Sequence, residues 1–175
     1  RAEAGRTVEF AGVPSVGLEF FSAAGCANTV TALSPAATAT SVTFYFKART
    51  AGALDITVSS DSLTSATQRH TIVAGAASAL AFTSAAQNLA LGACSAVAEI
   101  QSRDAYGNAS AVAAPVQVQL GASPATAVSF YSDPSCSAPV SAIPLSPSSI
   151  SAAFYFKGDA PGAVDIKASS TGLAE

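Results

Sequence analysis

The residues that could carry chemistry in this chain are few. His70 is the only imidazole, and serines are abundant, so a serine nucleophile with a histidine base is conceivable from residue types alone. However, His70 lies between Arg69 and Thr71 on an alternating segment, which indicates a structural residue on the surface of a strand. No carboxylate pair and no nucleophile with a base emerges, so we predict no catalytic residue and no enzyme activity.

Loop residues with side-chain oxygens form a second kind of candidate site. Asp104, Asn108 and Asp133 lie in turn-rich segments, and oxygen ligands of this kind are those that Ca²⁺ takes. The acidic residues form no dense cluster, and no histidine or second cysteine lies at ligand spacing from a cysteine. We therefore predict no metal ion and no cofactor, with a calcium site as the alternative.

Two lysines that follow aromatic residues form a third candidate site. A buried lysine beside a carboxylate could form an isopeptide bond, with the carboxylate moving the proton. The alternation along the chain instead places Lys47 and Lys157 outward, opposite Asp55 and Asp165. We therefore predict two exposed cross-strand ion pairs, Lys47 with Asp55 and Lys157 with Asp165.

Composition excludes two classes of function. The chain has 175 residues, 50% of them hydrophobic and 11% charged, and a net charge of −3. Its eight basic residues are scattered, so there is no electrostatic footprint for nucleic acid. No apolar run approaches the roughly 18 to 20 residues of a spanning helix, so we predict no membrane insertion. Because there is no methionine, we expect a processed product or a piece of a longer protein.

An internal repeat organises the elements that must position these residues. The segment 40–60, TSVTFYFKARTAGALDITVSS, returns as 150–170, ISAAFYFKGDAPGAVDIKASS, with matched residues 110 positions apart. A constant offset of about one small domain predicts a repeated fold. We predict one repeat over residues 1–74, lacking its first strands, and a second over residues 75–175, lacking its last strand.

Each copy of this segment is predicted to form two strands. Apolar and polar residues alternate with a period of two, which is typical of half-buried strands. With a turn centred near Ala51 in the first copy and Pro161 in the second, the two strands form a hairpin with its apolar side chains on one face. The predicted inward residues of the two hairpins are Phe44, Phe46, Ile56, Phe154, Phe156 and Ile166.

Two further strands are predicted before the second copy. Residues 78–82 alternate, and residues 94–103 alternate with Ala96, Ala98 and Ile100 facing inward. A full repeat then holds about seven strands in its 110 residues, which is the size and rhythm of a two-sheet sandwich. The predicted fold is all-β, with tandem immunoglobulin-like β-sandwiches.

The internal repeat predicts how the three cysteines pair. Cys94 and Cys136 flank strands of one repeat at what should be the same end of the sandwich, so we predict a disulfide between them. It would close a loop of about 40 residues and contribute roughly 2 to 4 kcal/mol. Cys26 is the equivalent of Cys136, so its natural partner would lie outside this chain. Three unpaired buried cysteines in a reducing compartment are the alternative.

Several strings resemble one family of surface proteins. These are the strand and turn QSRDAYGN at residues 101–108, the preceding LALGAC, the strand VQVQL at 116–120, and the FYFK hairpins. Together they resemble the bacterial immunoglobulin-like repeats of invasin- and intimin-type secreted and surface proteins. The resemblance implies export, tandem repetition and a spacer or adhesive role, and it carries over no catalytic residue.

We therefore expect a non-enzymatic structural repeat of a long extracellular surface or filament protein, which acts as a spacer or scaffold. The alternative is an adhesin-type binding module for a protein or glycan. The expected partners are neighbouring repeats or copies of the same protein, possibly joined by strand complementation, and a cell-surface protein or glycan. The expected location is extracellular or on the bacterial cell surface.

Overall fold

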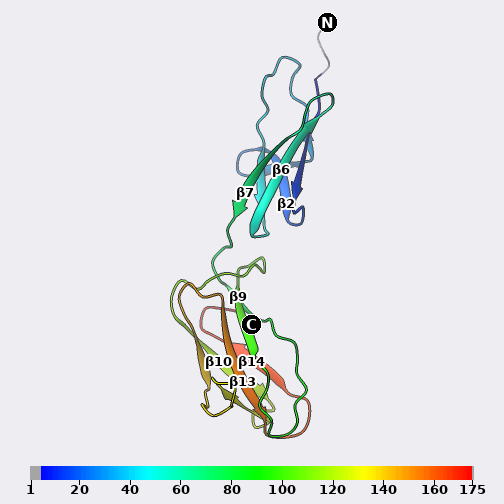
Figure 1. Ribbon diagram of the computed structural model, residues 1–175. Helices are drawn as coiled ribbons and strands as arrows, with labels where there is room; N and C mark the ends of the chain where they lie inside the picture. The colour runs from blue at the N-terminus through cyan, green and yellow to red at the C-terminus, as the bar shows by residue number, and fades with distance from the viewer. Residues whose placement is uncertain (1–4, 175) are drawn as a thin grey trace. The chain divides into compact units, whose positions relative to one another are not determined.

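The computed structural model describes residues 5–174, and every regular element in that range is a β-strand (Figure 1). The chain divides between Val73 and Ala74 into two compact units, here called the first and second unit. Each unit contains two antiparallel sheets in a sandwich-like arrangement. The prediction of an all-β sandwich fold is therefore confirmed.

The first unit contains seven strands among its described residues. One sheet has the order β4-β1-β6-β7 and the other the order β3-β2-β5. The strands are β1 (Val8–Val13), β2 (Leu18–Ala23), β3 (Ala27–Val30), β4 (Ala32–Leu33), β5 (Tyr45–Ala48), β6 (Gly52–Ser60) and β7 (Ala66–Ile72).

The second unit also contains seven strands among its described residues. Its sheets have the orders β11-β13-β9-β8 and β12-β10-β14. The strands are β8 (Ala79–Phe82), β9 (Ala98–Arg103), β10 (Val116–Ser123), β11 (Val128–Tyr131), β12 (Ala142–Leu145), β13 (Ser151–Gly158) and β14 (Asp165–Ser169).

Each unit has its own apolar core between its two sheets. In the first unit, the buried cluster is Phe10, Phe20, Leu54 and Ile56, and half-buried Phe44 and Phe46 pack against it. In the second unit the cluster is larger and includes Phe154, which is 0% exposed. Burial of these side chains, at about 25 cal/mol per Å² of apolar surface, is the main stabilising term for each sandwich.

Several ring contacts and strand pairings of the first unit recur in the second unit 110 residues later. The rings of Phe20 and Phe44 meet edge to face with centroids 6.0 Å apart, and those of Phe130 and Phe154 meet in the same way at 5.8 Å. Strand registers recur with the same offset. Three pairings are related in this way: Phe20–Phe46 and Phe130–Phe156, Val8–Leu33 and Val118–Ile143, and Val13–Asp55 and Ser123–Asp165.

The predicted hairpins are wrong in their pairing. β5 pairs with β2, whereas β6 pairs with β1 and β7, so the chain crosses from one sheet to the other between them. β13 and β14 are likewise in different sheets. Alternation shows which side chains face the core, and a turn within one sheet or a crossing between two sheets satisfies it equally. The predicted hairpin residues are therefore core residues of facing sheets: Phe44, Phe46 and Ile56 in the first unit, and Phe154, Phe156 and Ile166 in the second.

The predicted ion pair of Lys47 with Asp55 is wrong for the same reason. The two side chains project from the outer faces of different sheets. Asp55 instead accepts two hydrogen bonds from the guanidinium of Arg69 on β7, both at 2.8 Å. This interaction holds the pKa of Asp55 below its usual value. Lys47 lies opposite Glu19 on β2.

The predicted pair of Lys157 with Asp165 is also wrong. Lys157 lies on β13, with its Nζ atom 5.6 Å from the centroid of the Tyr131 ring. Asp165 begins β14, opposite Ser123 on β10. Here too, the two residues lie on different sheets, so the sandwich separates them.

Candidate functional site

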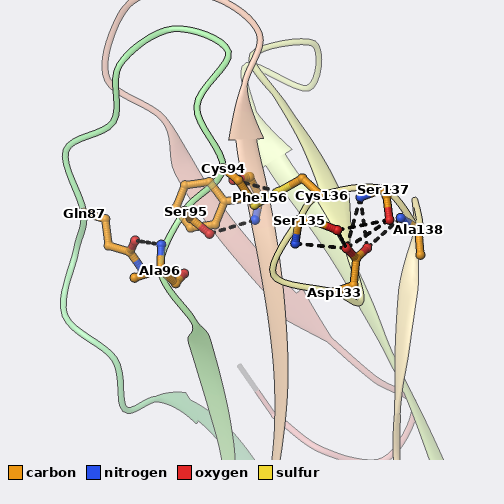
Figure 2. Close-up of a disulfide and its surroundings, with 10 residues drawn as sticks. All are labelled: Gln87, Cys94, Ser95, Ala96, Asp133, Ser135, Cys136, Ser137, Ala138 and Phe156. Carbon is orange, nitrogen blue, oxygen red and sulfur yellow. Dashed lines mark hydrogen bonds between the residues drawn. A yellow bond between two sulfur atoms is a disulfide. The ribbon is translucent and has the colours of Figure 1, made fainter.

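A disulfide joins Cys94 to Cys136 in the second unit, as predicted, with the two Cα atoms 5.8 Å apart (Figure 2). Cys94 precedes β9 and pairs with Lys157 of β13, while Cys136 lies in the turn that follows β11. The bond therefore ties the entry of β9 to the β11–β12 connection, next to β13. Among the described residues, Cys26 is the one cysteine outside a disulfide.

Ser95 continues the β9–β13 ladder past the disulfide. Its amide donates to the carbonyl of Phe156 at 2.8 Å, and the amide of Phe156 donates to the Ser95 hydroxyl at 2.9 Å (Figure 2). The side chain is buried, so an unpaired hydroxyl would be costly there. Ala96 is exposed, contrary to the prediction, because the regular strand begins only at Ala98.

The turn that carries Cys136 is organised by Asp133. Its carboxylate accepts backbone hydrogen bonds from Ser135 at 3.0 Å, Ser137 at 3.0 Å and Ala138 at 2.6 Å, and it also accepts from both serine hydroxyls (Figure 2). These donors, the Ser135 hydroxyl above all, hold the pKa of Asp133 well below its usual range. The carboxylate thus shapes the turn that presents the sulfur.

A second carboxylate, that of the buried residue Asp104, organises the loop after β9. It accepts hydrogen bonds from the amides of Gly75, Tyr106 and Asn108, at 2.8, 2.8 and 3.0 Å, and from the Asn108 side chain at 2.9 Å. The Asn108 side-chain bond is the chief cause that lowers the pKa of Asp104 to about 2. Ser110 closes the loop by donating its hydroxyl to the carbonyl of Gly75.

This geometry bears on the calcium alternative. Asp104 and Asn108 belong to one hydrogen-bond network, and Asp133 lies in a different turn with donors of its own. Backbone N–H groups thus point at both carboxylates, joined by the Asn108 side-chain amide at Asp104 and by two serine hydroxyls at Asp133, where a bound cation would need free oxygens. Within residues 5–174, His, Cys, Asp and Glu form no group of three or more that could hold a metal ion.

His70 packs at the edge of the apolar core of the first unit. The prediction that it points outward is wrong. It lies opposite buried Leu54 across the β6–β7 pair, and its ring centroid is 5.1 Å from that of Phe46. The ring is half-buried. It therefore acts as a flat packing residue of β7.

Sequence reasoning missed an open groove beside the core of the second unit. It has a volume of about 640 Å³, and its walls come from the 84–91 loop, β13, β14 and the loop before β14. Gln87 holds the loop in place by bonding the amide and carbonyl of Ala96 at 2.9 and 3.1 Å. The apolar lining includes Phe82, Leu89, Leu91, Phe154, Phe156, Val164 and Ile166.

The structure therefore contains braced loops and an apolar groove within a β-sandwich. No family model and no curated protein matches the sequence. Among solved structures, the chain is similar to a glycosyl hydrolase family 2 member from Bacteroides cellulosilyticus DSM 14838, at 12% identity and a TM-score of 0.45. The similarity covers 98% of this chain and 24% of that one.

Two β-glucuronidase structures give comparable values. One, from glycoside hydrolase family 2, is 14% identical with a TM-score of 0.44, over 98% of this chain and 18% of its own. The other, from Parabacteroides merdae, is 13% identical with a TM-score of 0.41, over 97% of this chain and 20% of its own. This chain spans less than a quarter of each of the three proteins, and these likenesses concern the fold alone.

Two observations bear on location. The disulfide indicates an oxidising environment outside the cytoplasm, because cytoplasmic thiols are kept reduced. Over the range that the structure describes, no helix is long and apolar enough to cross a membrane.

Proposed function

We propose that this chain is a non-enzymatic structural module of a longer extracellular or surface protein, in which consecutive β-sandwiches extend and space the polypeptide. One observation carries the proposal: the strand registers of the first unit recur in the second at a constant step of 110 residues. A chain of similar sandwiches in series is a common way to build stalks and filaments. The resemblance to invasin- and intimin-type repeats supports the same role.

The use made of the polar residues also supports this proposal. Asp104 and Asp133 accept hydrogen bonds from loop amides, and Ser95 and Ser102 hold neighbouring strands together. His70 packs on an aromatic ring. These polar side chains thus stabilise the loops and strands of the sandwich, as a spacer under tension requires.

The disulfide would give such a spacer a mechanical limit. The bond prevents the loop between Cys94 and Cys136, a sequence separation of 42 residues, from being pulled out. A fully extended chain spans about 3.3 to 3.6 Å per residue, so this loop corresponds to roughly 140 to 150 Å of contour length. An oxidised second unit should therefore lengthen much less than a reduced one when it unfolds under tension.

Single-molecule stretching of the complete chain between two handles tests this role. We expect two separate unfolding events, one per unit, and a gain of roughly 140 Å in one of them after reduction. The Cys26→Ser variant is the matched control and should leave both events unchanged. Extension at negligible force, with no discrete unfolding event, would show that the chain cannot act as a spacer.

Binding of a protein or glycan, as in an adhesin, is the second candidate function. The groove of about 640 Å³ in the second unit favours it, because pockets of this size and apolar character commonly bind ligands. An adhesin site for a glycan would need aromatic side chains gathered in one loop cluster, and Tyr106 and Tyr131, which could supply them, do not lie side by side. Tyr131 is at the level of Tyr155 on β13, whereas Tyr106 follows the far end of β9. These two tyrosines therefore do not form one surface for a glycan.

A further inference from the structure

The short connection that leads into the second unit is held at one residue, Gly75. Its amide donates a hydrogen bond to Oδ2 of Asp104 at 2.8 Å, and its carbonyl accepts a hydrogen bond from the hydroxyl of Ser110. Both polar groups of the Gly75 backbone are therefore bonded to side chains that follow β9. The two side chains, Asp104 and Ser110, are here called the clamp.

Gly75 divides the connection into two parts. Ile72 is the last residue of β7, and it is paired with β6. In the range 5–174, Val73 and Ala74 take part in no hydrogen bond, and Val73 is 81% exposed. Beyond Gly75, the amide of Ser78 donates to the last carbonyl of β9 at 2.7 Å. The clamp thus holds the connection between two anchored ends and leaves Val73 and Ala74 as the unheld part before it.

The residues of the clamp are buried and are themselves fixed to β9. Asp104 and Ser110 are 4% and 5% exposed. The amide of Ser110 donates to the carbonyl of Ser102 at 3.0 Å, and the hydroxyl of Ser102 donates to the carbonyl of Ser110 at 2.7 Å. The amide of Asp104 donates to the carbonyl of Asn108 at 2.9 Å. A buried network in which each group is bonded is rigid, so the clamp holds Gly75 in one position.

The two carboxylate oxygens of Asp104 have different partners. Oδ1 accepts hydrogen bonds from the amides of Tyr106 and Asn108, which shape the loop itself. Oδ2 accepts hydrogen bonds from the amide of Gly75 and from the side chain of Asn108. Hydrogen bonds to an ionised carboxylate are stronger than those between neutral groups. A change at Oδ2 can therefore release Gly75 while the amide bonds within the loop remain.

We propose that the clamp is a conformational device that makes residues 75–77 a rigid extension of the second unit and confines bending of the connection to Val73 and Ala74. Each unheld residue adds rotation about its φ and ψ angles, so fewer unheld residues give a stiffer connection. The use of this stiffness rests on the proposed spacer function, because a spacer keeps its reach when its connections resist bending. The clamp itself belongs to the second unit and has a test of its own.

Two variants of the ¹⁵N-labelled chain test the clamp. In Asp104→Asn, the remaining carbonyl oxygen can still accept from the loop amides, but the NH₂ group cannot accept from Gly75. We expect hydrogen exchange at the Gly75 amide to become about tenfold faster or more, since a hydrogen bond to a charged group is lost. Ser110→Ala removes the bond to the Gly75 carbonyl. It should lower the ¹H–¹⁵N NOE of residues 75–77 toward that of Val73, and the double variant should lower it further.

Asp133→Asn is the matched control. It changes another carboxylate of the second unit that accepts backbone hydrogen bonds in a loop. It should leave the exchange of Gly75 and the NOE of residues 75–77 unchanged. Hydrogen exchange at Ile100 in β9 reports on opening of the whole unit, and in Asp104→Asn it should change much less than exchange at Gly75.

Three results would overturn the proposal. They are NOE values for residues 75–77 in the parent chain as low as that of Val73, an increase in exchange at Gly75 no larger than that at Ile100, and an unchanged NOE in Ser110→Ala. Because Ser110→Ala leaves the backbone bonds of this residue in place, it tests the clamp even where Asp104→Asn does not fold. If the clamp passes these tests and the stretching experiment shows no discrete unfolding, the spacer role alone is wrong.

Discussion

The strands β6 and β14 occupy equivalent positions in two similar sandwiches, yet their surroundings differ. β6 is nine residues long and is flanked on both sides, whereas β14 is five residues long and, within residues 5–174, is flanked on one. The central apolar residues of β6 are buried and those of β14 are half-exposed. In these two units, the length and burial of a strand thus depend on the strands that flank it as well as on its own sequence.

The other sheet of each sandwich shows the reverse difference. β13 lies between β11 and β9, while its equivalent β5 is the last strand of its sheet among the described residues. Phe154 on β13 is fully buried, whereas Phe44, directly before β5, is half-buried. The same residue type at the same position of the repeat should therefore contribute more to the stability of the second unit.

The largest expected effect comes from this pair of phenylalanines. Phe154→Ala should destabilise the second unit by about 3 to 5 kcal/mol, the range for a fully buried aromatic residue. Phe44→Ala should cost the first unit clearly less, because part of the ring is already in contact with water. Urea denaturation followed by NMR signals from each unit measures both. Equal losses would contradict the difference in burial.

The disulfide should give the next largest effect. Replacing Cys94 and Cys136 together by serine should lower the free energy of unfolding of the second unit by about 2 to 4 kcal/mol, because a constraint on the unfolded chain is lost. Guanidinium denaturation under non-reducing conditions measures this. Cys26→Ser provides the control and should leave the stability of both units unchanged. A comparable loss in the first unit would show that the bond does not act locally.

Low pH should lower the stability of the second unit more than that of the first. The folded pKa of Asp104 is about 2, below the value of about 3.9 for an unfolded aspartate. The stabilisation from this carboxylate is therefore complete above about pH 4 and is lost as the pH falls through about 2. Asp133 acts in the same direction, and the first unit has Ala23 at the equivalent position. Carbon-detected titration should show low carboxyl midpoints for both residues; ordinary midpoints would remove the effect.

The smallest expected effect concerns the two equivalent aspartates Asp55 and Asp165. Asp55→Asn removes an ion pair with Arg69 and should slightly destabilise the first unit at pH 7. Asp165→Asn should leave the stability of the isolated second unit unchanged. Thermal unfolding at low and high salt measures the difference, which should shrink as salt screens the charges. A salt-dependent loss with Asp165→Asn would point to an ion pair that the structure does not contain.

Much of the fold could be predicted because the sequence repeats. The step between the segments 40–60 and 150–170, the positions of most strands and the pairing of Cys94 with Cys136 all follow from residue patterns. The pairing of β5 with β6 was predicted wrongly, since alternation defines faces and not sheets. That single error also produced the wrong partners for Lys47 and Asp55.

The features of the candidate site were harder to predict because they depend on contacts distant in sequence. Ser95 bonds Phe156 across 61 residues, and no local pattern marks one serine among many for this role. The groove lies between the 84–91 loop, β13 and the loop before β14, and no alternation reveals that these segments come together. The sequence identifies Asp104 and Asp133 as loop carboxylates that could bind calcium, but the donors that surround them become visible only in the folded loops.

Backbone cross-strand NOEs on the labelled chain test most directly whether the two units have the same strand pairings at an offset of 110 residues. We predict matching contacts between Phe20 and Phe46 and between Phe130 and Phe156, and equally between Val13 and Asp55 and between Ser123 and Asp165. Contacts that join Phe46 to Ile56 within one sheet, or registers in the two halves that differ by even one residue, would contradict it.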